Sequence, residues 1–207
     1  DRVGKGSVNH NSRKFRAENV DGTRTHLNID YCNENIKTVY HELFDEALER
    51  YNAKQIRSDR KIKDYYEKIR SSKQEKPFHE IILQVGGKGN MNADTENGEL
   101  AKQILDEYYQ GFQERNPQLR VFSAHLHMDE ATPHLHIDFV PFTTGSKRGL
   151  DTRVSLKQAL ATQGFKGGSR GDTEWSQWIQ SEKEQLAAVM ERYGIEWEHK
   201  GTHELSL

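Results

Sequence analysis

Apolar residues recur at the three- and four-residue spacing of an amphipathic helix in several parts of the chain. The spacing predicts helices from Thr38 to about Ala53, over residues 62–69 and 99–113, and from Thr173 to Gly194. Pro77 closes the second of these segments, and a glycine such as Gly194 is typical of a helix end. Helices are therefore expected in both halves of the chain.

Three other stretches are rich in apolar and β-branched residues, as strands are. They cover residues 78–85, 120–128 and 134–142. Only five residues join the last two, which predicts an antiparallel hairpin. The glycines that follow the first strand indicate a flexible turn, because the Gly-Lys-Ser/Thr ending of a phosphate loop is missing. The order of elements predicts an α+β fold, with a central antiparallel sheet and helices packed on one face.

The remaining segments have weaker patterns. Residues 1–14 are rich in Gly, Ser, Asn and Arg without a regular period, so a loop is expected there. Residues 143–170 are polar, Gly-rich and basic, which predicts a mobile arm with a short helix near 156–160. Residues 195–197 are a short strand candidate. The length suits one compact domain that spans residues 1–207.

Histidines gather on one face of the expected hairpin, because side chains alternate along a strand. In the first strand one face holds Val121, Ser123, His125 and His127, and the other holds Phe122, Ala124, Leu126 and Met128. In the second strand one face holds His134, His136 and Asp138, opposite Leu135, Ile137 and Phe139. If the apolar face rests on the helices, His127, His134 and His136 meet on the open face. Glu130 lies in the connecting loop.

Three neutral imidazoles can hold a divalent cation on one side and leave its other positions to water or a phosphate oxygen. Mn²⁺, Mg²⁺ and Zn²⁺ all suit such a set. Any single histidine on a strand face is more often an ordinary surface residue. Four histidines within twelve positions, at a spacing of two in each strand, favour an open metal site.

Charge and composition narrow the classes further. Lys and Arg number 30 against 32 Asp and Glu, a formal net charge of -2, so any site for a polyanion must be a local patch. No stretch reaches the roughly 20 apolar residues of a membrane span. A single cysteine, Cys32, excludes an internal disulfide and a Cys-rich zinc site, and a reducing cytoplasmic setting is expected. The start at Asp1 indicates a trimmed chain, expected to be an N-terminal fragment of a longer protein, and leaves open whether a first strand lies upstream.

The hairpin sequence HMDEATPHLH, residues 127–136, resembles the HxDExxPHxH metal motif of plasmid mobilisation relaxases of the Mob/Pre (MobV) family. His134-Leu135-His136 is also similar to the paired histidines of the wider HUH endonuclease superfamily. Two further blocks agree in order and spacing. Residues 10–13 (HNSR) resemble the family's HNxR motif, and residues 24–28 (RTHLN) resemble its second motif. The resemblance extends over the chain from Asn9 onward and implies an HUH relaxase-like fold.

The resemblance also implies roles for individual residues. His127, His134 and His136 would hold the divalent metal, most simply Mn²⁺ or Mg²⁺, and Glu130 would be a nearby acid, base or outer ligand. His10 matches the family's nucleophile, a histidine that attacks the scissile phosphate and remains linked to the 5′ end. Arg13 would support that phosphate, because its planar fork suits phosphate oxygens. Such a covalent intermediate retains the bond energy needed to rejoin the strand.

Tyrosine is the nucleophile in most HUH enzymes, so it is the rival to His10. The candidates are Tyr31, Tyr40, Tyr65 and Tyr66. Tyr65-x-x-Lys68 imitates a replication-initiator motif, but this pair lies in an amphipathic helix, where aromatic residues usually belong to the core. The tyrosine that commonly follows His-Leu-Asn in the family is Ile29 here. These observations favour the histidine.

Contacts with DNA are expected from two groups of residues. Asn11, Arg24, His26 and Asn28 lie in the N-terminal motifs, where DNA contacts and structural hydrogen bonds are equally open. Arg57, Arg60 and Lys61 lie in the densest basic run, whose interspersed acids also suit a solvated surface. A second basic run could also track phosphates, or could be a partly disordered loop; it comprises Lys147, Arg148, Arg153, Lys157, Lys166 and Arg170.

The favoured function is that of a metal-dependent relaxase domain that nicks a plasmid or mobile-element transfer origin through a phosphohistidine. Its partners would be single-stranded or hairpin origin DNA and other relaxosome or coupling proteins, with no membrane contact. One alternative is a rolling-circle replication initiator with a tyrosine nucleophile. Another is a non-catalytic, metal-dependent DNA-binding module, which failure to nick supercoiled DNA with any divalent ion would favour.

Overall fold

The computed structural model describes residues 5–14, 18–86, 93 and 96–195. The helices are α1 (Lys5–Asn11), α2 (Ile36–Ala53), α3 (Tyr65–Arg70), α4 (Glu96–Gln110), α5 (Phe112–Arg115), α6 (Leu156–Ala161) and α7 (Glu174–Arg192). The strands are β1 (Ile29–Asn33), β2 (His79–Gln84), β3 (Leu119–His127), β4 (His134–Thr143) and β5 (Arg153–Val154). Short 3₁₀ turns occur at Thr25–Leu27 and Ser58–Arg60.

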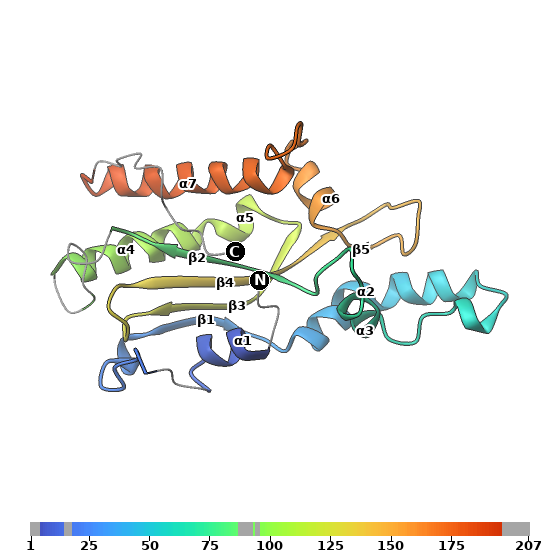
Figure 1. The fold of residues 1–207 in the computed structure, drawn as a ribbon, viewed down its shortest axis with the longest axis horizontal. Helices are drawn as coiled ribbons and strands as arrows, with labels where there is room; N and C mark the ends of the chain where they lie inside the picture. The colour runs from blue at the N-terminus through green and yellow to red at the C-terminus, as the bar shows by residue number, and fades with distance from the viewer. Residues whose placement is uncertain (1–4, 15–17, 87–92, 94–95, 196–207) are drawn as a thin grey trace.

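The strands form one antiparallel sheet in the order β1-β3-β4-β2, and β5 pairs with the end of β4. Figure 1 shows α4, α5 and α7 along one face of this sheet, α1 beneath the opposite face, and α2 extending beyond one end. The predicted α+β class, with a central antiparallel sheet, is confirmed. None of the described helices is long and apolar enough to cross a membrane.

The hairpin of β3 and β4 has the register that the sequence predicts at its closed end. His127 lies opposite His134, and His125 lies opposite His136. A β-bulge between Val121 and Ser123 interrupts the alternation farther along β3. Because of the bulge, Val121 faces Phe139 and joins the apolar core, so its expected place on the histidine face was wrong.

Two hydrophobic clusters stabilise the fold. The larger lies between the sheet and helices α4 to α7, and includes Leu126, Ile137, Ile104 and Trp178. The second lies between α2, α3 and the strand ends, where Phe44 packs with Phe122, Val140 and Leu150. The second cluster packs at the end of the sheet away from the β3–β4 loop. It therefore does not cover the hairpin histidines, which lie next to that loop.

Several local expectations from the sequence were wrong. Residues 5–11 form a helix rather than a loop, because α1 packs on β3 instead of depending on its own periodicity. Residues 143–161 are built into the fold by β5 and by the buried Leu150 and Val154. The helix predicted over 62–69 is shorter in the structure, where only α3 is helical. Asp64 is its N-cap, and the Asp64 side chain accepts a hydrogen bond from the Glu67 amide. Two of the three residues in the proposed C-terminal strand, 196 and 197, lie outside the described residues.

Candidate metal and nucleophile site

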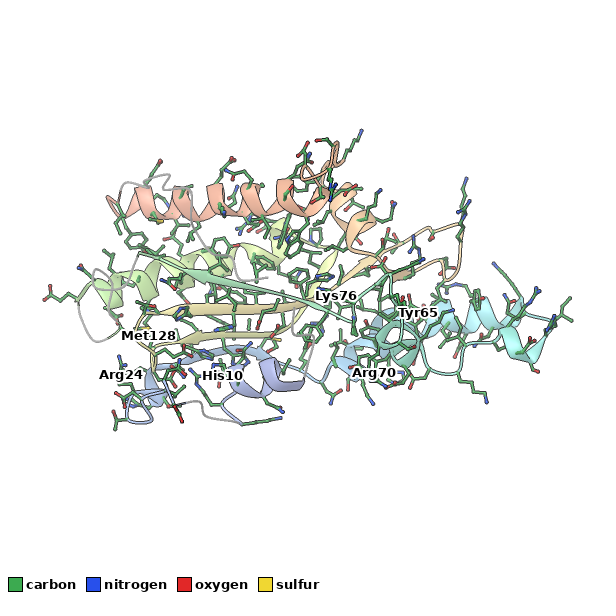
Figure 2. All side chains as sticks on the ribbon, in the orientation of Figure 1. His10, Arg24, Tyr65, Arg70, Lys76 and Met128 are labelled. Carbon is green, nitrogen blue, oxygen red and sulfur yellow. The ribbon has the colours of Figure 1, made fainter. Side chains whose placement is uncertain are left out.

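His10 comes to the histidine face of the sheet on the last turn of α1. Its Nε2 atom lies 3.3 Å from Oε1 of Glu130, and its ring meets the His127 ring edge to face at 6.0 Å between centroids. The ligand atoms of His10, His127 and Glu130 all lie within 4.8 Å of one another. Figure 2 shows His10 near Met128 and Arg24, at the end of the sheet where the β3–β4 loop closes.

Arg13 follows α1 in a left-handed backbone conformation, with φ at 56°, that non-glycine residues rarely adopt. Its NH1 donates to Nε2 of His10 at 3.1 Å and to the His10 carbonyl at 3.2 Å. A guanidinium can only donate, so Nε2 accepts in this contact and its lone pair points at Arg13. The helix end thus fixes both the position and the tautomer of His10.

Asp129 is the anchor that holds Arg13. This carboxylate is fully buried and accepts from Arg13 through both Nε and NH2, and from Thr25 and Asn28, each at 2.9 Å. Burial raises the pKa of Asp129, but the hydrogen bonds from Arg13, Asn28 and Thr25 outweigh it, so the net pKa is lowered. Sequence reasoning assigned Asp129 no role, although it stands inside the motif that carries Glu130.

The three hairpin histidines have the donor set that a divalent ion requires. The Nδ1 atoms of His127, His134 and His136 are buried and form no hydrogen bond among the described residues. The other ring nitrogen of His127 donates to the Asn11 carbonyl at 2.8 Å, which leaves Nδ1 with its lone pair free. Burial lowers the pKa of His134 and of His136, which favours the neutral form that binds metal. The chemistry of these three donors therefore fits a metal bound through Nδ1, whereas the described ligand atoms that lie within 4.8 Å of one another are those of His10, His127 and Glu130.

Glu130 stands between the nucleophile candidate and the histidines. Its carboxylate oxygens lie 3.6 Å from Nδ1 of His127 and 4.0 Å from Nδ1 of His134, and Arg13 donates to Oε1 at 2.9 Å. Burial alone would raise its pKa, but the neighbouring His127 imidazole, the hydrogen bond from Arg13 and the positive charge of Arg13 lower it below the ordinary value. Glu130 is therefore a carboxylate at neutral pH, able to accept a hydrogen bond or bind a cation.

A second pair of carboxyl groups lies beside His136 on the same face of the sheet. Glu80 on β2 has Oε2 3.4 Å from Nδ1 of His136, and this residue was missed because it stands in a mostly apolar strand sequence. Asp138 on β4 is fully buried beside it, and burial together with the Glu80 charge raises its pKa well above the ordinary value. The amide of Asn11 donates to both carboxyl groups. Asn11 is only 2% exposed, so it braces the site from beneath.

The other N-terminal residues surround the β3–β4 loop. Arg24 donates to the Glu130 carbonyl at 3.1 Å and pairs with Asp21. Asn28 bridges the loop by donating to Asp129 and accepting from the Met128 amide. His26 is exposed. Arg24 and Asn28 thus shape the loop that carries Glu130, and among these three residues only His26 is exposed.

The basic residues expected to contact DNA lie elsewhere. Arg57, Arg60 and Lys61 are exposed in the connection between α2 and α3, and Arg57 pairs with Asp59 at 2.6 Å. This connection lies beyond the end of the sheet opposite to His10 (Figure 1). The structure therefore separates these three residues from the histidine site.

The rival tyrosines all take part in structural contacts. Tyr65 accepts a hydrogen bond from the Val154 amide at 2.9 Å, and Tyr40 donates to the Pro77 carbonyl at 2.5 Å. Tyr31 donates to Asp106, and Tyr66 packs edge to face on Tyr40. Figure 2 shows Tyr65 well apart from His10, in α3 on the other side of the view. None of these four contacts involves a histidine of the hairpin.

Comparison with known proteins gives a family and a fold. A family model described as plasmid recombination enzyme (Mob/Pre) matches residues 7–166. The chain is 28% identical over 157 residues to plasmid recombination enzyme type 3 of Staphylococcus aureus, covering 74% of this chain and 33% of the relative. It is 24% identical over 187 residues to the type 1 enzyme of the same species, covering 89% of this chain and 44% of the relative. The chain thus spans between a third and a half of these curated relatives.

Solved structures agree on the fold. One is the Mn-bound MobM relaxase domain with a 22-nucleotide oriT DNA of plasmid pMV158 at pH 4.6, with a TM-score of 0.53 at 21% identity, covering 97% of this chain and 88% of that one. The same complex at pH 5.5 gives a TM-score of 0.51 at 20% identity, covering 96% and 85%. The family match extends from α1 through the histidine hairpin to α6, and the chain therefore belongs to the plasmid recombination enzyme (Mob/Pre) family.

Proposed function

We propose that this chain is the relaxase domain of its protein, and that it nicks one strand of a transfer origin through a phosphohistidine formed on His10. The observation that carries the proposal is the convergence of a nucleophile and a metal-ligand set. Oε1 of Glu130 lies 3.3 Å from Nε2 of His10 and 3.6 Å from Nδ1 of His127. The related Mn-bound MobM structures with oriT DNA support Mn²⁺ and origin DNA as the natural ligands.

The three hairpin histidines would hold the metal through their Nδ1 atoms, with Glu130 as a neighbouring ligand or acceptor. When bound there, a divalent ion would supply polarisation of the phosphoryl oxygens and neutralisation of the developing charge. The lowered pKa of Glu130 supports a role as a carboxylate rather than as a proton donor. Glu80 lies 3.4 Å from the same Nδ1 atom of His136, so its carboxylate would stand beside the bound ion.

Chemistry at His10 begins with the exchange of hydrogen-bond partners. Arg13 now donates to the Nε2 lone pair, and an incoming phosphate oxygen is a stronger acceptor for the same guanidinium. Once Arg13 turns to the phosphate, Nε2 is free to attack phosphorus. A bond forms between nitrogen and phosphorus, the bond to the 3′ oxygen breaks, and that oxygen leaves and gains a proton. The proton on Nδ1 is released, and reversal of these steps rejoins the strand.

The test is a search for a covalent adduct. The chain would be incubated with Mn²⁺ and single-stranded oligonucleotides that tile the transfer origin of the element encoding it. Parent, His10→Ala, Tyr65→Phe and His41→Ala forms would be compared; His41 is an exposed histidine on α2 and serves as the matched control. We expect an acid-labile, base-stable adduct that is lost only in His10→Ala.

Three outcomes contradict the proposal. An acid-stable adduct that survives His10→Ala would indicate a tyrosine nucleophile. An adduct that forms equally well with excess chelator would remove the metal from the reaction. The absence of any adduct, together with failure to nick supercoiled origin DNA, would favour a DNA-binding module without catalysis.

A further inference from the structure

A cleft of about 330 Å³ lies at the end of β4 farthest from the histidine loop. It is lined by the turn between β4 and β5 and by Gln158 at the start of α6. Three of its lining residues, Lys147, Arg148 and Arg153, are cationic, and none of its lining residues is acidic. The function proposed above does not use this cleft.

The turn that forms the cleft is held in a defined shape. Gly145 and Gly149 have φ of 68° and 70°, which side chains other than glycine rarely adopt. The Ser146 amide donates to the Asp151 carbonyl at 2.9 Å, and the Ser146 hydroxyl donates to the Arg148 carbonyl at 3.0 Å. Nε of Arg153 donates to the same hydroxyl at 2.9 Å. Arg153 is thus oriented at the cleft before any ligand arrives.

The positive charge of the cleft is not neutralised by neighbouring acids. Within the described part of the chain, Lys147, Arg148 and Arg153 form no ion pair with a carboxylate at 4.0 Å or less. Asp151, the acid in the same turn, is engaged on the outside by Arg50 through two hydrogen bonds of 2.8 and 2.9 Å. Burial raises the pKa of Glu75, the charge of Arg153 opposes that rise, and the two side chains form no ion pair. Three cations beside hydroxyl and amide groups form a site for a phosphate group.

We infer that this cleft binds a phosphate of the DNA backbone, at a position remote from the bond that is cut. The inference rests on the proposed function, because that function supplies the DNA. From His134 to Thr143 the β4 strand advances about 30 Å, at roughly 3.4 Å per residue. That length corresponds to about nine base pairs of duplex. The cleft therefore suits the duplex part of a hairpin origin rather than the nucleotides at the nick.

The neighbouring arm extends the same surface. The ion pair between Arg50 and Asp151 joins the end of α2 to the β4–β5 turn. The basic residues after α2 therefore follow the cleft along the same side of the molecule. Ile56 is fully exposed there, between Lys54 and Arg57. A line of cations that leads away from the active site is the expected arrangement for following a phosphate backbone.

The test compares DNA of different lengths with matched charge variants. Hairpin DNA with stems of 4, 8, 12 and 16 base pairs would be titrated against the parent and the Lys147→Gln/Arg148→Gln variant at several salt concentrations. The control, Lys102→Gln/Lys183→Gln, removes two charges from α4 and α7. On stems longer than about nine base pairs we expect the Lys147→Gln/Arg148→Gln variant to bind about tenfold more weakly than the parent. The slope of log K against log salt concentration should be shallower by about one to two. On the shortest stem it should bind like the parent.

Three results would overturn the inference: equal affinity and slope on all stems, an equal loss on short and long stems, or the same loss in the control variant. Titration with inorganic phosphate distinguishes the source of the ligand. Saturable binding of free phosphate that needs Lys147 and Arg148, with no effect of stem length, would assign the cleft to a small phosphate compound instead. Adduct formation on the short oligonucleotide tests the proposed function separately, because DNA binding is measured here without cleavage.

Discussion

Asp129 should be a buried carboxylate whose replacement strongly destabilises the fold. Replacing it by alanine removes the two carboxylate oxygens that accept from Nε and NH2 of Arg13, whose side chain is only 9% exposed. It also leaves the Thr25 hydroxyl and the Asn28 amide without this acceptor. Breaking a buried ion pair from one side costs about 3–5 kcal/mol. Arg13 keeps Glu130 as a partner, which favours the lower end, and the two orphaned donors add about 1 kcal/mol or more. We expect a total loss of about 4 kcal/mol in the free energy of unfolding.

Asp138 provides a matched control, because it is equally buried but has the opposite protonation preference. Burial and the Glu80 charge raise its pKa, which favours the neutral acid, and Asp138→Asn replaces that form by a neutral group of the same shape. We expect Asp138→Asn to cost less than about 1 kcal/mol. Asp129→Asn removes a charge that Arg13 requires and should cost about 2 kcal/mol or more.

The assay is urea unfolding at pH 7, followed by circular dichroism and by fluorescence of tryptophans, including Trp178, which is fully buried. Because domains of this size have a total stability of about 5–15 kcal/mol, the Asp129→Ala midpoint should shift clearly. Equal costs for Asp129→Asn and Asp138→Asn would refute the reasoning. So would an unchanged midpoint in Asp129→Ala, since the network around Arg13 would then contribute nothing.

Three further predictions concern other parts of the molecule. Burial lowers the pKa of His79 to about 4, so below pH 6.5 the unfolded chain binds more protons than the folded one. The free energy of unfolding should therefore fall, by at most about 3 kcal/mol, as the pH drops from 6.5 to 4. His79→Leu should flatten that part of the profile of stability against pH, measured by urea titration. Arg13→Lys replaces a fork by a point charge and should lower the rate of adduct formation about 10- to 100-fold, with unchanged Mn²⁺ affinity by calorimetry. His134→Ala should weaken Mn²⁺ binding at least about tenfold in the same calorimetric assay, and His41→Ala should not change it.

Local geometry made the hairpin predictable. Side chains alternate in any strand, and a five-residue connection brings the two strands side by side, so His127, His134 and His136 were expected on one face. The motif spacing added His10, Arg13 and Glu130 through resemblance to the Mob/Pre family. The bulge at Val121 and the strand β1 escaped prediction, because β1 has a mixed polar sequence and a bulge has no periodic signal.

The sequence by itself therefore determined which side chains share a strand face and which family the motifs belong to. The tertiary structure alone decided how α1 brings His10 to Glu130, and how Arg13 reaches Asp129 across 116 residues. It also decided that Glu80 contacts His136 from the neighbouring strand, and that the β4–β5 turn forms a cationic cleft. The physical reason is that alternation depends on a residue's immediate neighbours. These other contacts depend on how distant segments pack together, and the periodicity of nearby residues carries no information about that packing.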